Sequence, residues 1–120
     1  MKILLVEDDP LLVKMYQTKL KIEGFEVVIA GDGLEGWELV QKEDPDFMVL
    51  DMMMPKLSGL ELLQKIRDDE NLKLIPTIML SNMNRAEEME KAQKLGVKEF
   101  ILKANFTPGQ IIEKIRQYMK

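Results

Sequence analysis

Five short runs of apolar residues recur along the chain, and each run is continuous rather than alternating with polar positions. A continuous run is typical of a strand that is covered on both faces, as strands of a parallel sheet are. The runs occupy residues 3–6, 27–30, 47–50, 77–80 and 100–102. We therefore expect five buried strands.

The segments between these runs have helical spacing instead. Two of them begin with clear helix starts: Asp9 can cap a helix that opens with Pro10, and Thr107 opens the capping-box sequence TPGQ. The segment around residues 85–95 is barely amphipathic. The segment after the third run places four residues on one helical face: Gly59, Leu62, Leu63 and Ile66.

Five strands that alternate with five helices predict an α/β fold with right-handed crossovers. The pattern is that of a flavodoxin-like, doubly wound, five-stranded parallel sheet with the strand order 2-1-3-4-5. The chain has 120 residues, 46% of them hydrophobic, which suffices for one core and is too short for two. We expect residues 1–120 to form a single domain.

The amino-acid composition excludes several kinds of functional site. The chain has no cysteine and no histidine, which excludes disulfides, thiol nucleophiles, Ser-His-Asp triads and the usual zinc ligands. Its net charge of -4 gives no basic field for direct nucleic-acid binding. No stretch is apolar enough to span a membrane, and the N-terminus leads straight into a strand, so we expect a cytoplasmic protein without membrane contact.

Polar side chains follow four of the expected strands. Glu7 and Asp8 follow the first strand, Asp51 ends the third, Ser81 ends the fourth and Lys103 ends the fifth. In an open parallel sheet, ligands bind beyond the carboxyl ends of the strands, where the winding reverses between strands 1 and 3. Glu7, Asp8 and Asp51 are therefore expected to converge.

Convergence of three carboxylates needs a counter-charge. At ~4 Å and an effective dielectric of about 20, each pair of like charges costs on the order of 4 kcal/mol. Hard carboxylate oxygens suit Mg²⁺, which would relieve this repulsion. Asp51 could then act as a nucleophile toward phosphorus, with Lys103 as a second counter-charge and the Ser81 hydroxyl as a hydrogen-bond donor to a phosphoryl oxygen.

With these motifs in order, the sequence resembles the receiver domains of two-component response regulators, typified by the chemotaxis response regulator. The resemblance covers essentially the whole chain. It rests on the acidic pair in LLVEDD, the acceptor in VLDMMMPKLSG, the hydroxyl in IMLSN and the lysine in FILK. Each motif alone is weak, but four at successive strand ends in the right order are a strong signal.

The resemblance implies a phosphoacceptor site. Asp51 would accept a phosphoryl group from a phosphohistidine of a sensor histidine kinase or a phosphotransfer protein. Asp8 would bind Mg²⁺ directly, Glu7 would act mainly through water, and the Met53 backbone carbonyl would complete the protein ligands. Beyond its own phosphorylation and slow self-dephosphorylation, a receiver of this kind is not an enzyme.

The resemblance also implies a switch. Ser81 stands at the switch hydroxyl position and Phe100 at the switch aromatic position. Phosphorylation would change the face formed by the fourth helix, fifth strand and fifth helix, and this face would signal to an output partner or domain that the sequence does not identify.

Other interpretations stay open at this stage. A small phosphatase with an aspartate nucleophile would need Asp-x-Asp, but residue 53 is Met. A degenerate receiver would bind partners without phosphorylation, although the acidic, hydroxyl and lysine positions are all filled. A nucleotide-binding module is disfavoured by an acidic first loop without glycine. Ser81 could cap the fourth helix, and Phe100 could be simple core.

Two positions depart from the family pattern. Ala104 follows the active-site lysine, where the family usually has a proline after a cis peptide bond. We expect a cis Lys103–Ala104 bond, which keeps Lys103 in place, although a trans bond with a different turn is the alternative. Ser58 stands where the family often has aspartate, and we expect it to cap the third helix.

Overall fold

The computed structural model describes residues 1–83 and 85–119, and within these ranges five strands alternate with five α-helices. The strands form one parallel sheet in the order β2-β1-β3-β4-β5, as expected. The strands are β1 (Lys2–Val6), β2 (Glu26–Ala30), β3 (Phe47–Asp51), β4 (Thr77–Ser81) and β5 (Glu99–Leu102). The helices are α1 (Pro10–Ile22), α2 (Gly33–Glu43), α3 (Gly59–Asp68), α4 (Ala86–Lys94) and α5 (Pro108–Tyr118).

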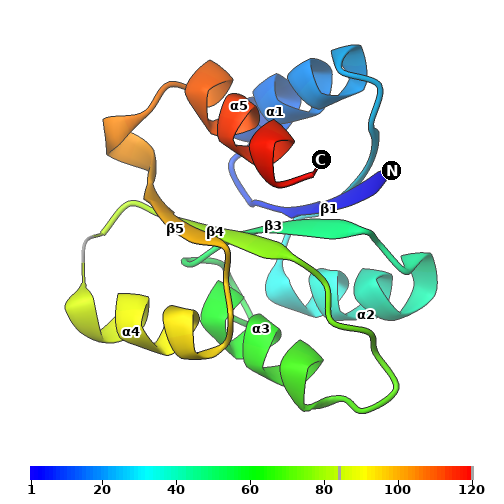
Figure 1. Ribbon diagram of the computed structural model, residues 1–120, viewed down its shortest axis with the longest axis vertical. Coiled ribbons are helices and arrows are strands. Elements are labelled where there is room, and N and C mark those ends of the chain that lie inside the picture. The colour runs from blue at the N-terminus through cyan, green and yellow to red at the C-terminus, as the bar shows by residue number, and fades with distance from the viewer. Residues whose placement is uncertain (84, 120) are drawn as a thin grey trace.

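The sheet lies between two layers of helices (Figure 1). Helices α1 and α5 cover one face, and α2, α3 and α4 cover the other. Alternate residues of β1 serve the two cores: Ile3 and Leu5 pack with α1 and α5, whereas Leu4 and Val6 pack on the opposite side. This two-sided burial explains the continuous apolar runs. The edge strands β2 and β5 are less buried than the three central strands.

The expected helix starts are confirmed. The Asp9 side chain accepts hydrogen bonds from the amides of Leu11 and Leu12, and Pro10 opens α1. Complete capping boxes begin α3 at Ser58 and α5 at Thr107. Because an N-cap side chain satisfies amides that the helix leaves unpaired, these short motifs fix where the helices begin.

The inward face of α3 is confirmed as well, since all four residues that share the expected face are buried. In α2 the pattern is less regular: Leu34 is exposed, and the buried residues are Gly33, Gly36 and Val40. Helix α4 presents only Ala92 as a fully buried residue. No helix within the described ranges has the length and apolar character that crossing a membrane requires.

The expected cis bond between Lys103 and Ala104 was wrong. The described residues contain no cis peptide bond. A short 3-10 turn over Lys103–Asn105 follows β5 instead, closed by a bond from the Phe106 amide to the Lys103 carbonyl at 3.3 Å. This turn brings the Lys103 side chain to the carboxyl edge of the sheet with a trans backbone, so the cost of a cis bond before alanine, ~2.5–4 kcal/mol, is not incurred.

Candidate functional site at the carboxyl edge of the sheet

Three carboxylates converge at the carboxyl edge of the sheet. Val6 pairs with Leu50 in the β1–β3 register, so Glu7 and Asp51 leave adjacent strands at the same level. One carboxylate oxygen from each of Glu7, Asp8 and Asp51 lies within 4.8 Å of the others. Glu7 and Asp51 are buried, whereas Asp8 is exposed. The predicted convergence is confirmed.

The Lys103 ammonium joins the two buried carboxylates. Its Nζ lies 2.7 Å from Glu7 Oε1 and 3.1 Å from Asp51 Oδ2, and its side chain is only 9% exposed. One ammonium therefore balances part of the charge of three carboxylates. The cluster keeps an excess of negative charge, which a bound cation would complement.

Backbone amides hold the carboxylates in place. Glu7 Oε2 accepts from the amides of Asp8 and Asp9 at 3.1 and 3.3 Å, while its other oxygen is taken by Lys103. Both oxygens of Glu7 are thus engaged within the protein. Asp51 Oδ1 has a single long bond from the Met53 amide, at 3.4 Å, and keeps free acceptor capacity.

Burial and neighbouring charges shift the pKa values of Glu7 and Lys103. Burial raises the pKa of the Glu7 carboxyl, and the adjacent Asp51 raises it further against the opposing effect of Lys103. Burial by itself lowers the pKa of the Lys103 ammonium, but Glu7 and Asp51 together outweigh this effect and raise it. Lys103 is therefore held as a cation between the two carboxylates.

Two glycines let the loop between β3 and α3 pack closely, Gly59 against the backbone of Asp51 and Gly33 against Leu57, and sequence reasoning did not identify this role. A Cβ on Gly59 would clash with the Asp51 carbonyl oxygen, and a Cβ on Gly33 would clash with the Leu57 carbonyl oxygen. The Gly59 amide also donates to the Met52 carbonyl at 3.0 Å. A glycine at a helix start gives no sign, in sequence, of what will lie against it.

Ser81 is buried at the end of β4, but its hydroxyl faces its own loop. The hydroxyl donates to the Met83 carbonyl and accepts from the Met83 amide, both at 3.0 Å. It does not cap α4, which begins after Arg85 without a side-chain cap. Since Asp51 pairs with Leu80, Ser81 lies one residue beyond it on the neighbouring strand. Asn84 lies outside the described residues.

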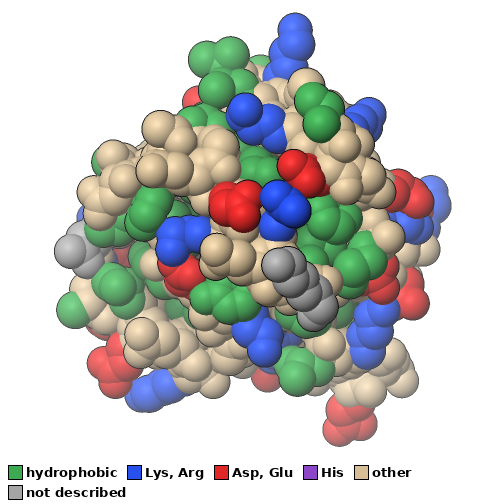
Figure 2. Space-filling view, turned by 45° about the horizontal axis from the view of Figure 1, so that its top comes forward, with side chains coloured by type: hydrophobic (Ala, Val, Ile, Leu, Met, Phe, Trp, Pro, Cys, Tyr) green, Lys and Arg blue, Asp and Glu red, His purple; other side chains and the backbone are tan. Residues whose placement is uncertain are grey.

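The other two predicted positions differ in exposure. Met53 is 53% exposed in the loop after β3. Phe100 in β5 is half-buried and packs against the core on the α2, α3 and α4 side. Charges of both signs are interspersed on the face shown in Figure 2, with hydrophobic side chains between them.

The fold and this cluster define a class of protein, and comparison with known families identifies it. Residues 3–116 match the model of the response regulator receiver domain, and the chain belongs to this family. It is a receiver domain of two-component signalling, a family of typically non-enzymatic signalling modules. The acidic cluster of Glu7, Asp8 and Asp51 fits a phosphoacceptor site of this kind.

Two individual relatives of the chain are a probable transcriptional regulator and a response regulator. The chain is 32% identical, over 99% of its length, to a probable transcriptional regulator ycf27 of Porphyridium aerugineum, and spans about half (48%) of that protein. It is 30% identical to the polar-differentiation response regulator DivK of Brucella ovis, with 98% of this chain and 94% of DivK covered. One relative is therefore much longer than this chain and the other is of similar length.

One solved structure to which the chain is similar is a metal-bound form. The Mn²⁺-bound form of response regulator Rcp1 matches with a TM-score of 0.86 and 26% identity, over 98% of this chain and 93% of Rcp1. The carboxylate oxygens of this chain form a donor set that suits hard divalent cations such as Mg²⁺ and Mn²⁺. The acidic cluster is thus able to bind a metal.

Proposed function

We propose that Asp51 is a phosphoacceptor that receives a phosphoryl group from a phosphohistidine of a sensor histidine kinase or a phosphotransfer protein. A carboxylate oxygen of Asp51 attacks phosphorus, and the bond between phosphorus and the imidazole nitrogen breaks, with its electron pair returning to nitrogen. The observation that carries this proposal is the meeting of Asp51 with two further carboxylates and one buried ammonium.

A divalent cation, Mg²⁺ above all, would supply the counter-charge that phosphoryl transfer requires. We assign Asp8, Asp51 and the Met53 backbone carbonyl as direct ligands and Glu7 as a ligand acting through water. The engagement of both Glu7 oxygens by Lys103 and by backbone amides supports its indirect role. The exposure of Asp8 supports a direct one, because its carboxylate faces solvent from which a cation arrives.

Lys103 and Ser81 stabilise the transferred group in this proposal. The Lys103 ammonium already contacts Asp51 Oδ2 at 3.1 Å and would donate to an oxygen of the phosphoryl group. The Ser81 hydroxyl would rotate away from Met83 and donate to a second phosphoryl oxygen. Its present bonds lie within one local turn, so the rotation exchanges one set of hydrogen bonds for another.

The proposed output is a change of the face formed by α4, β5 and α5. Movement of Ser81 would draw the loop before α4 toward Asp51, and Phe100 would turn further inward, as a shift between two packings of the protein. The half-buried state of Phe100 supports this role, since part of the side chain is still exposed and a further turn inward would bury it. The altered face would signal to an output partner, which we leave unnamed.

We further propose that residues 1–120 act as one domain in the cytoplasm, and that the chain catalyses only its own phosphorylation and slow dephosphorylation. A phosphatase with an aspartate nucleophile is disfavoured because Met53 occupies the position of its second aspartate. A degenerate receiver is disfavoured because the three carboxylates and Lys103 are brought together intact.

Phosphorylation with acetyl phosphate tests the acceptor. We expect intact-protein mass spectrometry to show one added phosphoryl group with Mg²⁺ present, and none in Asp51→Asn or in EDTA. Asp9→Asn is a matched control, because it removes a nearby carboxylate whose role is to cap α1. Equal labelling of Asp51→Asn, or labelling that ignores EDTA, would contradict the proposal.

The switch needs a separate test. Ser81→Ala should still be phosphorylated on Asp51, while amide chemical shifts of α4 should no longer respond to a phosphoryl mimic such as beryllofluoride. An α4 response that matches wild type would refute the coupling through Ser81 without affecting the assignment of Asp51.

A further inference from the structure

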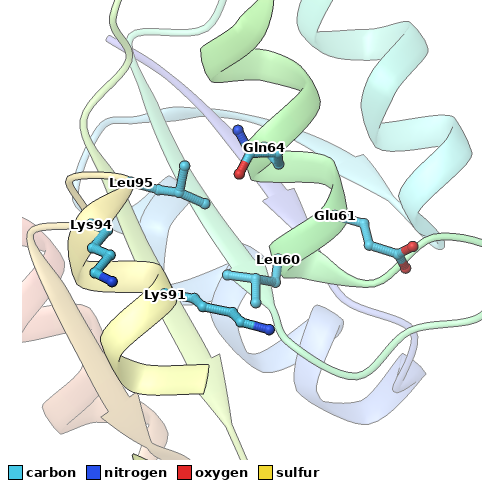
Figure 3. Close-up of a pocket in the computed structure, with 6 residues that line it drawn as sticks. All are labelled: Leu60, Glu61, Gln64, Lys91, Lys94 and Leu95. Carbon is cyan, nitrogen blue, oxygen red and sulfur yellow. The ribbon is translucent and has the colours of Figure 1, made fainter. Parts of the chain in front are cut away.

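A groove lies between α3 and α4, on the opposite side of the sheet from α1 and α5. Its volume is about 260 Å³. Side chains of both helices line it (Figure 3). The lining residues are Leu60, Glu61 and Gln64 of α3, together with Lys91, Lys94 and Leu95 at and after the end of α4.

The groove has apolar walls and two lysines, Lys91 and Lys94, on its rim. Leu60 and Leu95 face the gap from its two sides, and the Lys91 stem extends across it below Leu60 (Figure 3). Both leucines are only partly buried, so each keeps apolar surface in contact with solvent. Glu61 points away from α4. Its carboxylate accepts a hydrogen bond from the Ser58 amide at 3.0 Å as part of the α3 capping box.

The two lysines of the rim are available to a partner. Lys91 lies 3.6 Å from Glu87 and Lys94 lies 3.3 Å from Glu90, both as neighbours one helical turn apart. The lysine side chains are 60% and 75% exposed. Exposed pairs of this kind contribute ~0.2–1 kcal/mol, so an incoming carboxylate can replace them at little cost.

One end of the groove is held by Arg67. Its guanidinium donates from Nε to the Leu95 carbonyl at 2.9 Å and from Nη2 to the Ile75 carbonyl at 3.1 Å. These bonds join the end of α3 to the turn after α4 and to the start of β4. The backbone at Leu95, which carries one wall of the groove, is therefore fixed relative to α3.

We propose that this groove binds an acidic peptide segment of a partner protein, which inserts one bulky apolar side chain between Leu60 and Leu95. A carboxylate beside that side chain pairs with Lys91 or Lys94. The volume favours a single anchoring side chain, because pockets for whole small molecules typically measure about 300–1,000 Å³. The two exposed ammonium groups on the rim favour an acidic segment. This proposal does not rest on phosphorylation of Asp51.

Titration of ¹⁵N-labelled protein with a synthetic peptide tests the proposal. The probe is the blocked heptapeptide GDEFEDG, with two matched peptides in which Phe is replaced by Ala, or Asp and Glu by Asn and Gln. We expect amide shifts confined to α3, α4 and the turn at Leu95, with a dissociation constant on the order of 1 mM. Both matched peptides should bind more weakly, and added salt should weaken the acidic peptide further.

Charge reversal provides the matched protein variants. Lys91→Glu with Lys94→Glu should weaken binding about tenfold or more, because two attractive pairs become repulsive. The control is Lys21→Glu with Lys42→Glu, which changes the net charge equally on α1 and α2, away from the groove. This control should bind as wild type does. Thermal melts of both double variants establish that each remains folded.

Several results would overturn the proposal. Equal binding of the neutral peptide would remove the basis for an acidic partner. Shifts located on another face, no shifts at all, or equal weakening by both double variants would exclude the groove. Groove shifts that appear on raising the protein concentration without peptide would show that a second copy of the chain occupies the site instead.

Discussion

Charged side chains are buried or partly buried at both ends of the sheet, and their partners differ between the two ends. At the carboxyl edge, Glu7 and Asp51 share the single ammonium of Lys103, with Asp8 beside them. At the amino edge, Arg67 of α3 reaches the start of β4 and donates only to uncharged oxygens. Its acceptors are the carbonyls of Leu95 and Ile75 and the Thr77 hydroxyl.

The comparison shows that Arg67 serves the structure, whereas the acidic cluster is suited to binding. A guanidinium is always ionised and has several donors in a fixed plane, so neutral oxygens can satisfy most of it without a carboxylate. Within the described residues, Nη1 of Arg67 is the only buried side-chain nitrogen or oxygen atom without a hydrogen-bond partner. The carboxyl edge instead holds more like charge than its one cation neutralises, which lowers stability there and leaves the site ready for a cation.

The largest expected effect comes from removing the cation of the acidic cluster. Lys103→Met leaves Glu7 and Asp51 buried without their partner, so the metal-free protein should lose about 3 kcal/mol of unfolding free energy. Urea titration in EDTA measures this, with Lys42→Met on the exposed face of α2 as control. An unchanged midpoint would show that Lys103 does not stabilise the two buried carboxylates.

Repeating the urea titration with Mg²⁺ tests whether Lys103 and the metal act at the same place. A cation bound among the carboxylates replaces part of the lost charge, so the gap between Lys103→Met and wild type should narrow when Mg²⁺ is added. A gap of constant size would mean that Lys103 and the metal act at separate places.

The second effect concerns the opposite end of the sheet. Arg67→Met leaves the Leu95 carbonyl without its donor and removes one donor each from the Ile75 carbonyl and the Thr77 hydroxyl, so we expect a loss of about 2 kcal/mol. The loss should be the same with EDTA and with Mg²⁺, because Arg67 takes no part in the acidic cluster. Arg85→Met, at an exposed arginine, is the control. A loss that depends on Mg²⁺ would break the distinction between the two ends.

The third, smaller effect is a pH dependence of the acidic cluster. Burial raises the pKa of Glu7 above its ordinary value of 4.5, so the folded protein holds a proton that the unfolded chain releases. The contribution of Glu7 to stability is therefore greatest below pH 4.5 and is lost as pH rises through the raised value.

Glu7→Gln isolates this contribution, because glutamine mimics the protonated carboxyl. In EDTA, the stability of Glu7→Gln relative to wild type should increase as pH rises from 4.5 toward neutrality. Arg67→Met relative to wild type should show no such trend, since arginine stays ionised throughout. Urea titrations over this range measure both differences, and a flat difference for Glu7→Gln would contradict the assigned direction.

The smallest effect is a gain in stability. Asp8→Asn removes one like charge from the cluster, and because Asp8 is exposed, the metal-free protein should gain only about 0.5 kcal/mol. The same variant should lose most of the stabilisation that Mg²⁺ gives to wild type. Thermal melts with EDTA and with Mg²⁺ measure both, with Glu38→Gln as an exposed control. A clear loss of stability in EDTA would argue against repulsion at Asp8.

The sequence by itself determined the strands, the helix starts and the approximate place of the site. Continuous apolar runs, the caps at Asp9, Ser58 and Thr107, and polar residues at strand ends are local signals. Parallel winding then brings all carboxyl ends to one edge, so Glu7, Asp8 and Asp51 had to converge once the strand order was known.

Only the tertiary structure decided how the charges pair and how the loops close. The contact of Lys103 with Glu7 joins residues 96 positions apart, and the close approach of Gly59 to the Asp51 backbone depends on how α3 docks. The trans turn after Lys103 likewise replaced the cis bond expected from family resemblance. These features depend on distances between distant segments, and a local pattern of residue types does not contain those distances.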